Sequence, residues 1–263
     1  MKKITVSLFL LTGFFLFITN NASAYKADKR SYYEIKLYHV STDEQVQQVD
    51  HFLETAYLPA LHRAGIPKIG VYHWAGNDTS ADKRIYLFIP LRSLEDMNTV
   101  EELMLKDKEL QASGDAYWNV AFDATPFKRI ETIVLKAFPM MPKFQVPALT
   151  GNKTSRVYEL RSYEGPTERL YRQKVDMFNN AGEVDLFKRL NFNAVFYGEV
   201  LSGSRMPNLM YMTSFTNQAD RDEHWKKFSS DPVWVGIKDL PQYLHTVSRN
   251  ETLFLHPTEF SEI

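Results

Sequence analysis

The sequence predicts an α+β fold made of two tandem ferredoxin-like β-α-β-β-α-β units that close into a barrel-like pseudo-dimer. The first observation is an internal repeat: Glu34-x-Lys36-x-Tyr38 returns 125 residues later as Glu159-x-Arg161-x-Tyr163. Similarity at a long fixed spacing indicates a duplicated structural unit. The second observation is the order of hydrophobic patterns in each copy, which is strand, helix, strand, strand, helix, strand, the order of a split β-α-β unit.

The repeat extends well beyond this motif. Residues 86–91 match 210–215 at an offset of 124, and Arg129-x-Glu131-Thr132 matches Arg249-x-Glu251-Thr252. Between these blocks, Ser113-x-Asp115-x-x-Trp118 matches Ser229-x-Asp231-x-x-Trp234 at an offset of 116. The smaller offset predicts that repeat one carries about eight extra residues around residues 101–110.

The first strand and helix of repeat one follow from periodicity. Residues 33–39 alternate with period two, so Ile35 and Leu37 lie on an apolar face and Glu34, Lys36 and Tyr38 on a polar face. Ser41 and Glu44 form a capping box that starts a helix. Pro59 is expected to kink or split that helix, and Gly65 to end it.

The remaining elements complete the unit. Strands are expected over residues 69–74, 84–91 and 131–136, with a second helix that starts at Ser93. Repeat two follows the same order, and its first helix begins near Pro166. The predicted organisation is repeat one over residues 30–137, a proline-rich extended linker over 138–155, and repeat two over 156–260.

The pairing of the two units follows from their architecture. A β-α-β-β-α-β unit has helices on only one face of its sheet, and the other face must be buried. Two units in one chain can bury those faces against each other. The alternative is homo-oligomerisation through free sheet edges, which the sequence leaves open.

The first 24 residues are predicted to be a cleavable signal peptide. Lys2 and Lys3 precede an apolar stretch over residues 4–18, and Ala22-Ser23-Ala24 is a small-residue cleavage site. The apolar stretch is short for a membrane span, so no stable membrane anchor is expected after cleavage behind Ala24. The segment is typical of bacteria and predicts a periplasmic or secreted protein.

Composition excludes several classes of function. The chain has 31 basic and 32 acidic residues and no cysteine. The balanced charge argues against a nucleic-acid partner. The lack of cysteine excludes disulfides, thiolate metal sites and a cysteine nucleophile.

The chain resembles the NIPSNAP family of the dimeric α/β-barrel superfamily. The resemblance is carried by residues 158–163, by residues 208–215 with the following helix that contains Trp225, and by Ser230-Asp231-Pro232-Val233-Trp234. Repeat one is a weaker match, because Lys36 replaces arginine and an insertion interrupts its later part. The resemblance implies ferredoxin-like units paired in an α/β barrel. It implies no general chemistry, although the wider superfamily includes cofactor-free monooxygenases and haem-handling enzymes.

The repeated charged motif is the first candidate ligand site. Glu34, Lys36 and Tyr38, with Glu159, Arg161 and Tyr163, are expected to point into the barrel between the repeats. Buried charges must be paired, so these residues form either a polar ligand pocket or a structural network of ion pairs along the seam between the repeats. The structural interpretation is favoured, because a catalytic group is usually needed once and this motif occurs twice.

The second strands supply the other candidates for ligand binding. Tyr72 and Trp74 lie on one parity with Phe196, and His73 and Tyr197 lie on the other. An aromatic-lined cavity for a small ligand is one interpretation, and plain core is the commoner role of aromatic residues in strands. The repeats differ most here, since His73 corresponds to Tyr197 and Trp74 to Gly198.

No metal site or cofactor is predicted. No pair of the seven histidines has the metal-typical i, i+4 spacing, and a lone haem ligand such as His224 is the remaining alternative. Glycine-rich phosphate loops, the Gly-x-Ser-x-Gly elbow and His-Glu-x-x-His are absent from the sequence. The sequence thus favours an exported protein that binds a small molecule or partner in the cavity between the repeats. The alternative is an enzyme of the cofactor-free monooxygenase or haem-handling type.

Overall fold

The computed structural model describes residues 30–263, and the predicted signal peptide lies outside this range. Repeat one has four strands, with helices between them in the predicted order. Its elements are β1 (Tyr32–Val40), α1 (Asp43–Phe52), a π-helical segment (Leu53–Tyr57), α2 (Leu58–Arg63), β2 (Gly70–Trp74), β3 (Lys83–Leu91), α3 (Leu94–Lys106), α4 (Lys108–Ser113), α5 (Asp115–Trp118) and β4 (Arg129–Ala137).

Repeat two has the same arrangement. Its elements are β5 (Val157–Glu164), α6 (Glu168–Asn179), α7 (Glu183–Arg189), β6 (Phe196–Ser202), β7 (Asn208–Phe215), α8 (Gln218–Ser230), α9 (Pro232–Ile237), a short 3₁₀ turn (Pro241–Tyr243) and β8 (Arg249–Pro257). Within residues 30–263, no helix has both the length and the apolar character needed to cross a bilayer.

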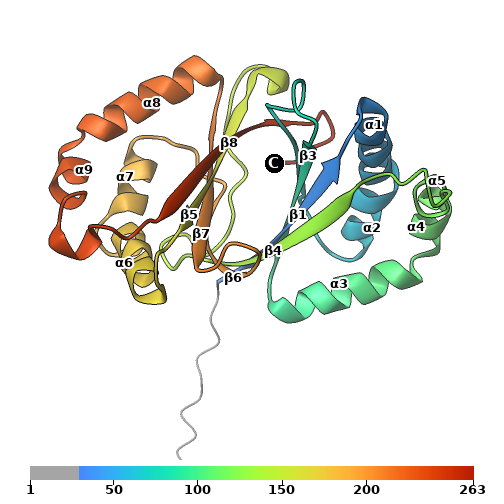
Figure 1. Ribbon diagram of the computed structural model, residues 1–263, viewed down its shortest axis with the longest axis horizontal. Helices are drawn as coiled ribbons and strands as arrows, with labels where there is room; N and C mark the ends of the chain where they lie inside the picture. The colour runs from blue at the N-terminus through green and yellow to red at the C-terminus, as the bar shows by residue number, and fades with distance from the viewer. Residues whose placement is uncertain (1–29) are drawn as a thin grey trace, which may run out of the picture.

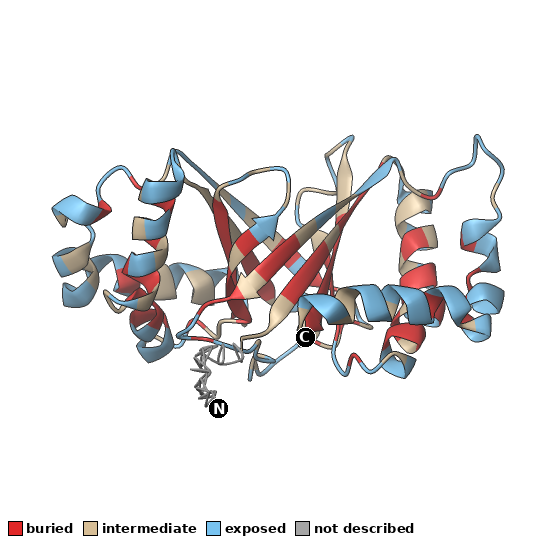
Figure 2. Ribbon diagram, turned by 90° about the horizontal axis from the view of Figure 1, so that it is seen from below, coloured by how far each residue is buried: buried red, intermediate tan, exposed pale blue. Residues whose placement is uncertain are grey.

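The eight strands form one closed barrel, in the order β1-β3-β2-β8-β5-β7-β6-β4. All of their pairings are antiparallel. Strand β2 pairs with β8, and β4 pairs with β6, so the edges of each four-stranded sheet are paired with the other repeat. The barrel lies in the centre of the molecule, and the two sets of helices lie on opposite sides of it (Figures 1 and 2). The predicted pseudo-dimer of two α+β units is confirmed.

The interior of the barrel is filled by apolar side chains from both repeats. Tyr33, Ile35 and Leu37 of β1 point inward with Phe88 of β3 and Phe196 of β6. The rings of Phe88 and Phe196 stack with their centroids 5.0 Å apart. An eight-stranded barrel has an interior just wide enough for side chains to fill it, and these residues do so.

A second apolar layer lies between each sheet and its own helices. In repeat one it includes Val40 of β1, Leu61 of α2 and Leu87 of β3. In repeat two it is mostly aromatic and includes Phe178 and Phe187. Both faces of every sheet are therefore covered, one by the other repeat and one by helices.

The first helical region shows the predicted effect of Pro59. A π-helical segment interrupts the helix immediately before α2, whose first turn contains Pro59. Proline has no N–H to donate and its ring clashes with the carbonyl four residues earlier, so the wider π-turn precedes it. Gly65 follows the helix with φ of +91°, as expected for a C-terminal glycine. The N-cap is Thr42, one residue after the predicted Ser41.

The insertion in repeat one lies later than predicted. Asp107 and Asp231 are structurally equivalent. Each caps the helix that follows it, and each binds an arginine, which is Arg63 of α2 for Asp107 and Arg189 of α7 for Asp231. The offset is thus still 124 residues at this point, and it is 120 at the start of the last strands. Repeat one carries four extra residues after Asp107, in the region of α5, and the predicted match of Asp115 with Asp231 was wrong.

The segment between the repeats packs against repeat two. Between Ala137 and the short 3₁₀ turn Lys153–Ser155 it contains no helix or strand. Phe138 and Gln145 of this segment donate backbone hydrogen bonds to the carbonyls of Tyr197 and Val195 in repeat two. Phe138 is fully buried against repeat two.

Candidate functional site

The repeated Glu-x-Lys/Arg-x-Tyr motif does not point into the barrel, which corrects the expectation from sequence. Because Tyr33, Ile35 and Leu37 fill the interior, the alternate residues of β1 and β5 face the helices of their own repeat. The predicted charged seam between the repeats was therefore wrong. Strand periodicity separates two faces correctly but does not say which face points inward.

In repeat two the motif belongs to a hydrogen-bond network between β5 and α8, in which both carboxylate oxygens of Glu159 are bound. Glu159 is fully buried and accepts hydrogen bonds from Arg161 at 2.6 Å and from Arg221 at 2.8 and 3.0 Å. Trp225 donates its indole N–H to the same carboxylate at 2.7 Å and stacks its ring against the Arg161 guanidinium. Burial alone raises the pKa of Glu159, but the two arginines outweigh it and hold the pKa below its ordinary value.

The tyrosines of the motif belong to these same helix-side layers. Tyr163 accepts a hydrogen bond from Arg161 at 2.9 Å, and its hydroxyl lies 3.0 Å from that of Tyr211. Tyr38 is buried under the helices of repeat one. Glu159, Arg161 and Tyr163 thus form one network inside repeat two.

In repeat one the same motif is sparsely paired. Glu34 lies 3.5 Å from Lys36, and the ammonium of Lys36 lies over the ring of Tyr57. Burial raises the pKa of Glu34 above its ordinary value, with Lys36 opposing the rise and Glu101 adding to it. The glutamates of the two copies therefore have pKa shifts of opposite direction.

The candidates on the second strands are dispersed. Tyr72 and Trp74 share one face of β2, as their parity predicted, and this face belongs to the barrel interior, where Tyr72 is fully buried against Tyr158. His73 faces outward and binds Asp50 of α1 at 2.9 Å. Tyr197 is buried in the aromatic layer under the helices of repeat two. These residues line no common cavity.

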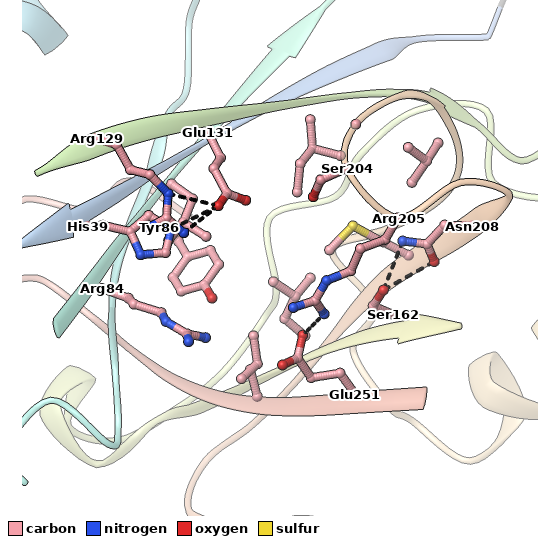
Figure 3. Close-up of a pocket in the computed structure, with 17 residues that line it drawn as sticks. His39, Arg84, Tyr86, Arg129, Glu131, Ser162, Ser204, Arg205, Asn208 and Glu251 are labelled. Carbon is pink, nitrogen blue, oxygen red and sulfur yellow. Dashed lines mark hydrogen bonds and ion pairs between the residues drawn. The ribbon is translucent and has the colours of Figure 1, made fainter. Parts of the chain in front are cut away.

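The cavity that both repeats do share lies at one mouth of the barrel, and we call it the barrel mouth (Figure 3). It has a volume of about 100 Å³. Strands β1, β3 and β4 form one side, and β5, β6, β7, β8 and the β6–β7 loop form the other. Its polar lining consists of His39, Arg84, Tyr86, Arg129, Glu131, Ser162, Ser204, Arg205, Asn208 and Glu251.

Two arginine–glutamate pairs stand at the rim of the barrel mouth. Arg129 donates to Glu131 at 2.6 Å on β4, and Arg205 of the β6–β7 loop donates to Glu251 of β8. Buried His39 binds Asp82 at 2.9 Å through Nδ1, while its Nε2 lies 3.3 Å from Glu131. In Figure 3 the polar ends of Arg84, Tyr86 and Arg205 point toward the same central space.

Tyr86 and Glu131 of the barrel mouth have shifted pKa values. Burial raises the pKa of Tyr86 to about 12, with Arg84 opposing the rise, so its hydroxyl keeps its proton and can donate at neutral pH. Burial also raises the pKa of Glu131, but Arg129 and His39 outweigh it and the net shift is downward. The barrel mouth therefore presents the ionised carboxylate of Glu131, guanidinium groups and a phenol donor.

Sequence reasoning missed these residues, although one signal for them was present. The repeated Arg-x-Glu-Thr block contains Glu131 and Glu251, which the barrel brings to the same cavity. Glu131 and Glu251, on the last strand of each repeat, thus line the barrel mouth. The glutamates on the first strands, Glu34 and Glu159, face the helices instead. Arg205 lies in a loop and belongs to no periodic pattern.

The described residues offer no cluster for a metal ion. In residues 30–263, no group of three or more histidine, aspartate or glutamate side chains has the required geometry. His224, the candidate haem ligand, donates from Nδ1 to the carbonyl of Asp220 at 2.7 Å and packs edge-on to Phe192.

Comparison with known proteins identifies the second repeat. Residues 158–262 match the family model of NIPSNAP. Repeat two is a NIPSNAP domain. A NIPSNAP family protein from Agrobacterium tumefaciens aligns with 41% of this chain and 98% of its own, at 20% identity and a TM-score of 0.37. No curated protein matches the chain.

Some longer solved structures align with both repeats of this chain, that is, with repeat one and the NIPSNAP domain. Two bacterial proteins named "putative monooxygenase" align at a TM-score of 0.56. The one from Lactobacillus acidophilus is 10% identical and covers 87% of this chain and 94% of its own. The one from Fusobacterium nucleatum is 7% identical, with 88% and 94% covered. At such identity the likeness establishes the dimeric α/β-barrel fold and not the activity.

Proposed function

We propose that this protein is exported and binds a small carboxylate-bearing molecule at the barrel mouth. The observation that carries the proposal is that Arg84, Arg129 and Arg205, which come from three different elements, all line one cavity. A guanidinium is a planar fork of donors that matches a carboxylate. Both repeats contribute, so the site exists only in the closed barrel.

The size of the cavity limits the ligand. A dry cavity of about 150 Å³ in another protein accommodates benzene. The barrel mouth, at about 100 Å³, is smaller and polar. It therefore fits a molecule of about five non-hydrogen atoms, such as a short hydroxy acid, and it is far too small for a porphyrin.

The polar groups of the barrel mouth suit an anion with a further polar group. The lining holds three arginines and two glutamates, and Arg84 also pairs with Asp82 at 3.1 Å, so an anion would be bound by the guanidinium N–H groups that these carboxylates do not use. The Tyr86 hydroxyl is an additional donor. The free oxygens of Glu131 and Glu251 can accept from a hydroxyl or an ammonium group.

Calorimetric titration with glycolate tests this proposal. We expect saturable binding to the wild-type protein and at least about tenfold weaker binding to Arg205→Gln, since a hydrogen bond to a charged group contributes about 1.5–3 kcal/mol. Arg249→Gln is the matched control. Arg249 is the repeat-two counterpart of Arg129 but lies outside the cavity, so its loss should leave binding unchanged.

Two results would overturn the proposal. One is the absence of saturable heat with glycolate, lactate or acetate. The other is equal weakening by Arg205→Gln and Arg249→Gln, which would indicate general electrostatic attraction instead of a built site.

Export is tested by the N-terminus of the mature protein. Expressed in a Gram-negative bacterium, the full chain should be recovered from the periplasm or medium with Tyr25 as its first residue, because cleavage follows Ala24. Intact-protein mass spectrometry measures this. Replacing Ala22 and Ala24 by glutamate should block cleavage. Recovery of wild-type protein that starts at Met1 in the cytoplasm would contradict the prediction.

A further inference from the structure

A larger cavity lies between the sheet of repeat one and its helices α3, α4 and α5, and we call it the helix-side pocket. Its volume is about 560 Å³, within the range of about 300–1,000 Å³ that is typical of small-molecule sites. Glu34, Lys36 and Tyr57 form its polar floor. Its walls are mainly apolar and include Met97, Met104 and Trp118.

The second repeat shows what fills the equivalent space there. Helices α3 and α8 have the same length and equivalent caps. Asp96 and Asp220 each accept a hydrogen bond from the backbone N–H four residues earlier, and Ser93 and Asn217 are the respective N-caps. The offset between the two helices is thus 124 residues throughout.

This correspondence pairs Arg221 with Met97, and Trp225 with Glu101. In repeat two, the guanidinium of Arg221 and the indole of Trp225 both bind the carboxylate of Glu159. In repeat one, a methionine and a glutamate stand at these positions. Glu34 therefore has no equivalent of the Arg221 guanidinium or the Trp225 indole, which both bind Glu159.

The chemistry of the pocket identifies what would replace them. Glu34, Glu101 and Asp115 are three carboxylates in a lining that contains one ammonium, Lys36. An excess of negative charge beside an apolar wall favours a ligand with a cationic end and an aromatic body. Met97 and Met104 are adaptable side chains that contact aromatic rings favourably.

We propose that the helix-side pocket binds an organic cation of the arylalkylamine class. Its ammonium or guanidinium group lies between Glu34 and Glu101 and supplies Glu34 with the cationic contact that Arg221 gives Glu159 in repeat two, and its ring lies against Met97 and Trp118. This site is separate from the barrel mouth and does not depend on the function proposed there.

Calorimetric titration with tryptamine, which joins an indole to an ammonium group, tests the proposal. We expect saturable binding of tryptamine and none of indole-3-acetate, which has a similar ring and the opposite charge. Glu34→Gln should weaken tryptamine binding at least about tenfold. Arg249→Gln, which is distant from the pocket, should bind tryptamine as the wild type does.

A second variant fills the pocket with the residues of repeat two. In Met97→Arg/Glu101→Trp, the new side chains should occupy the space and abolish tryptamine binding, and the melting temperature should rise. Equal binding of tryptamine and indole-3-acetate would overturn the proposal. So would a wild-type protein that binds neither, or one in which a second copy of the chain covers this face in solution.

Discussion

Replacing Glu159 by glutamine is expected to lower the free energy of unfolding by about 3 kcal/mol. The carboxylate is fully buried and accepts four hydrogen bonds from Arg161, Arg221 and Trp225. Glutamine keeps the shape but leaves two partly buried guanidinium groups without this counter-charge and turns an amide N–H₂ toward donors. Removal of one partner from a buried ion pair typically costs about 3–5 kcal/mol. Urea denaturation measures the change directly.

Glu34→Gln is the matched control in the other repeat. Glu34 has one charged partner at 3.5 Å, and burial raises its pKa. A carboxyl whose pKa is raised by folding favours the folded state when protonated, and that contribution is lost as the pH rises through the folded value. At neutral pH, a neutral glutamine should therefore leave stability unchanged or slightly increased. Equal destabilisation by the two substitutions would contradict the asymmetry between the repeats.

The pH dependence of unfolding provides a further test of the same network. The pKa of Glu159 is lowered in the folded protein. Its contribution is therefore complete above the unfolded value of about 4.5 and is lost as the pH falls through the folded value. The stability difference between wild type and Glu159→Gln should shrink below pH 4.5. A difference that is constant from pH 7 to pH 3 would show that packing, and not charge, is responsible.

Lys174→Met is the second substitution with a large expected effect. Lys174 and Glu183 are both buried, and their side chains are joined at 3.0 Å within the aromatic layer of repeat two. The ammonium also lies 4.8 Å from the ring centre of Phe178. Loss of the lysine leaves Glu183 buried without a counter-charge, which should cost about 3–5 kcal/mol by urea denaturation.

The double variant Lys174→Met/Glu183→Leu separates charge from packing. Buried pairs can often be replaced by apolar residues of similar size with little loss, so the double variant should recover most of the stability. Lys226→Met, on the exposed part of α8, should change stability by less than about 0.5 kcal/mol. A double variant that is no more stable than Lys174→Met alone would contradict this explanation.

The sequence was sufficient for the fold because two independent patterns agree. The repeat predicted two copies of one unit, and the strand and helix periodicities predicted the β-α-β-β-α-β order that the structure shows. Boundaries moved by one or two residues, as at Thr42. The insertion was misplaced because Ser113-x-Asp115 is similar in sequence to Ser229-x-Asp231. The true counterpart of Asp231 is Asp107, and this is visible only in the structure, where Asp107 caps the following helix and binds an arginine.

The candidate site was harder to predict because both faces of each sheet are buried. Alternation placed Glu159 and Leu160 on opposite faces, but the charged face turned out to be the one under the helices. The reason is that α8 supplies Arg221 and Trp225 to the carboxylate, whereas the barrel interior supplies only apolar side chains at that level. Partners this distant in sequence are not visible in a strand pattern.

Methionine-methyl NMR tests the central claim, that the barrel mouth is a binding site distinct from the helix-side layers. Met210 lines the barrel mouth, and Met97 and Met104 line the helix-side pocket, so one sample labelled at methionine methyl groups reports on both. Methionine-to-leucine variants assign the signals. On titration with glycolate, the Met210 signal should shift to saturation while Met97 and Met104 stay unchanged. A Met210 signal that does not move, or that moves only together with Met97 and Met104, would contradict the account.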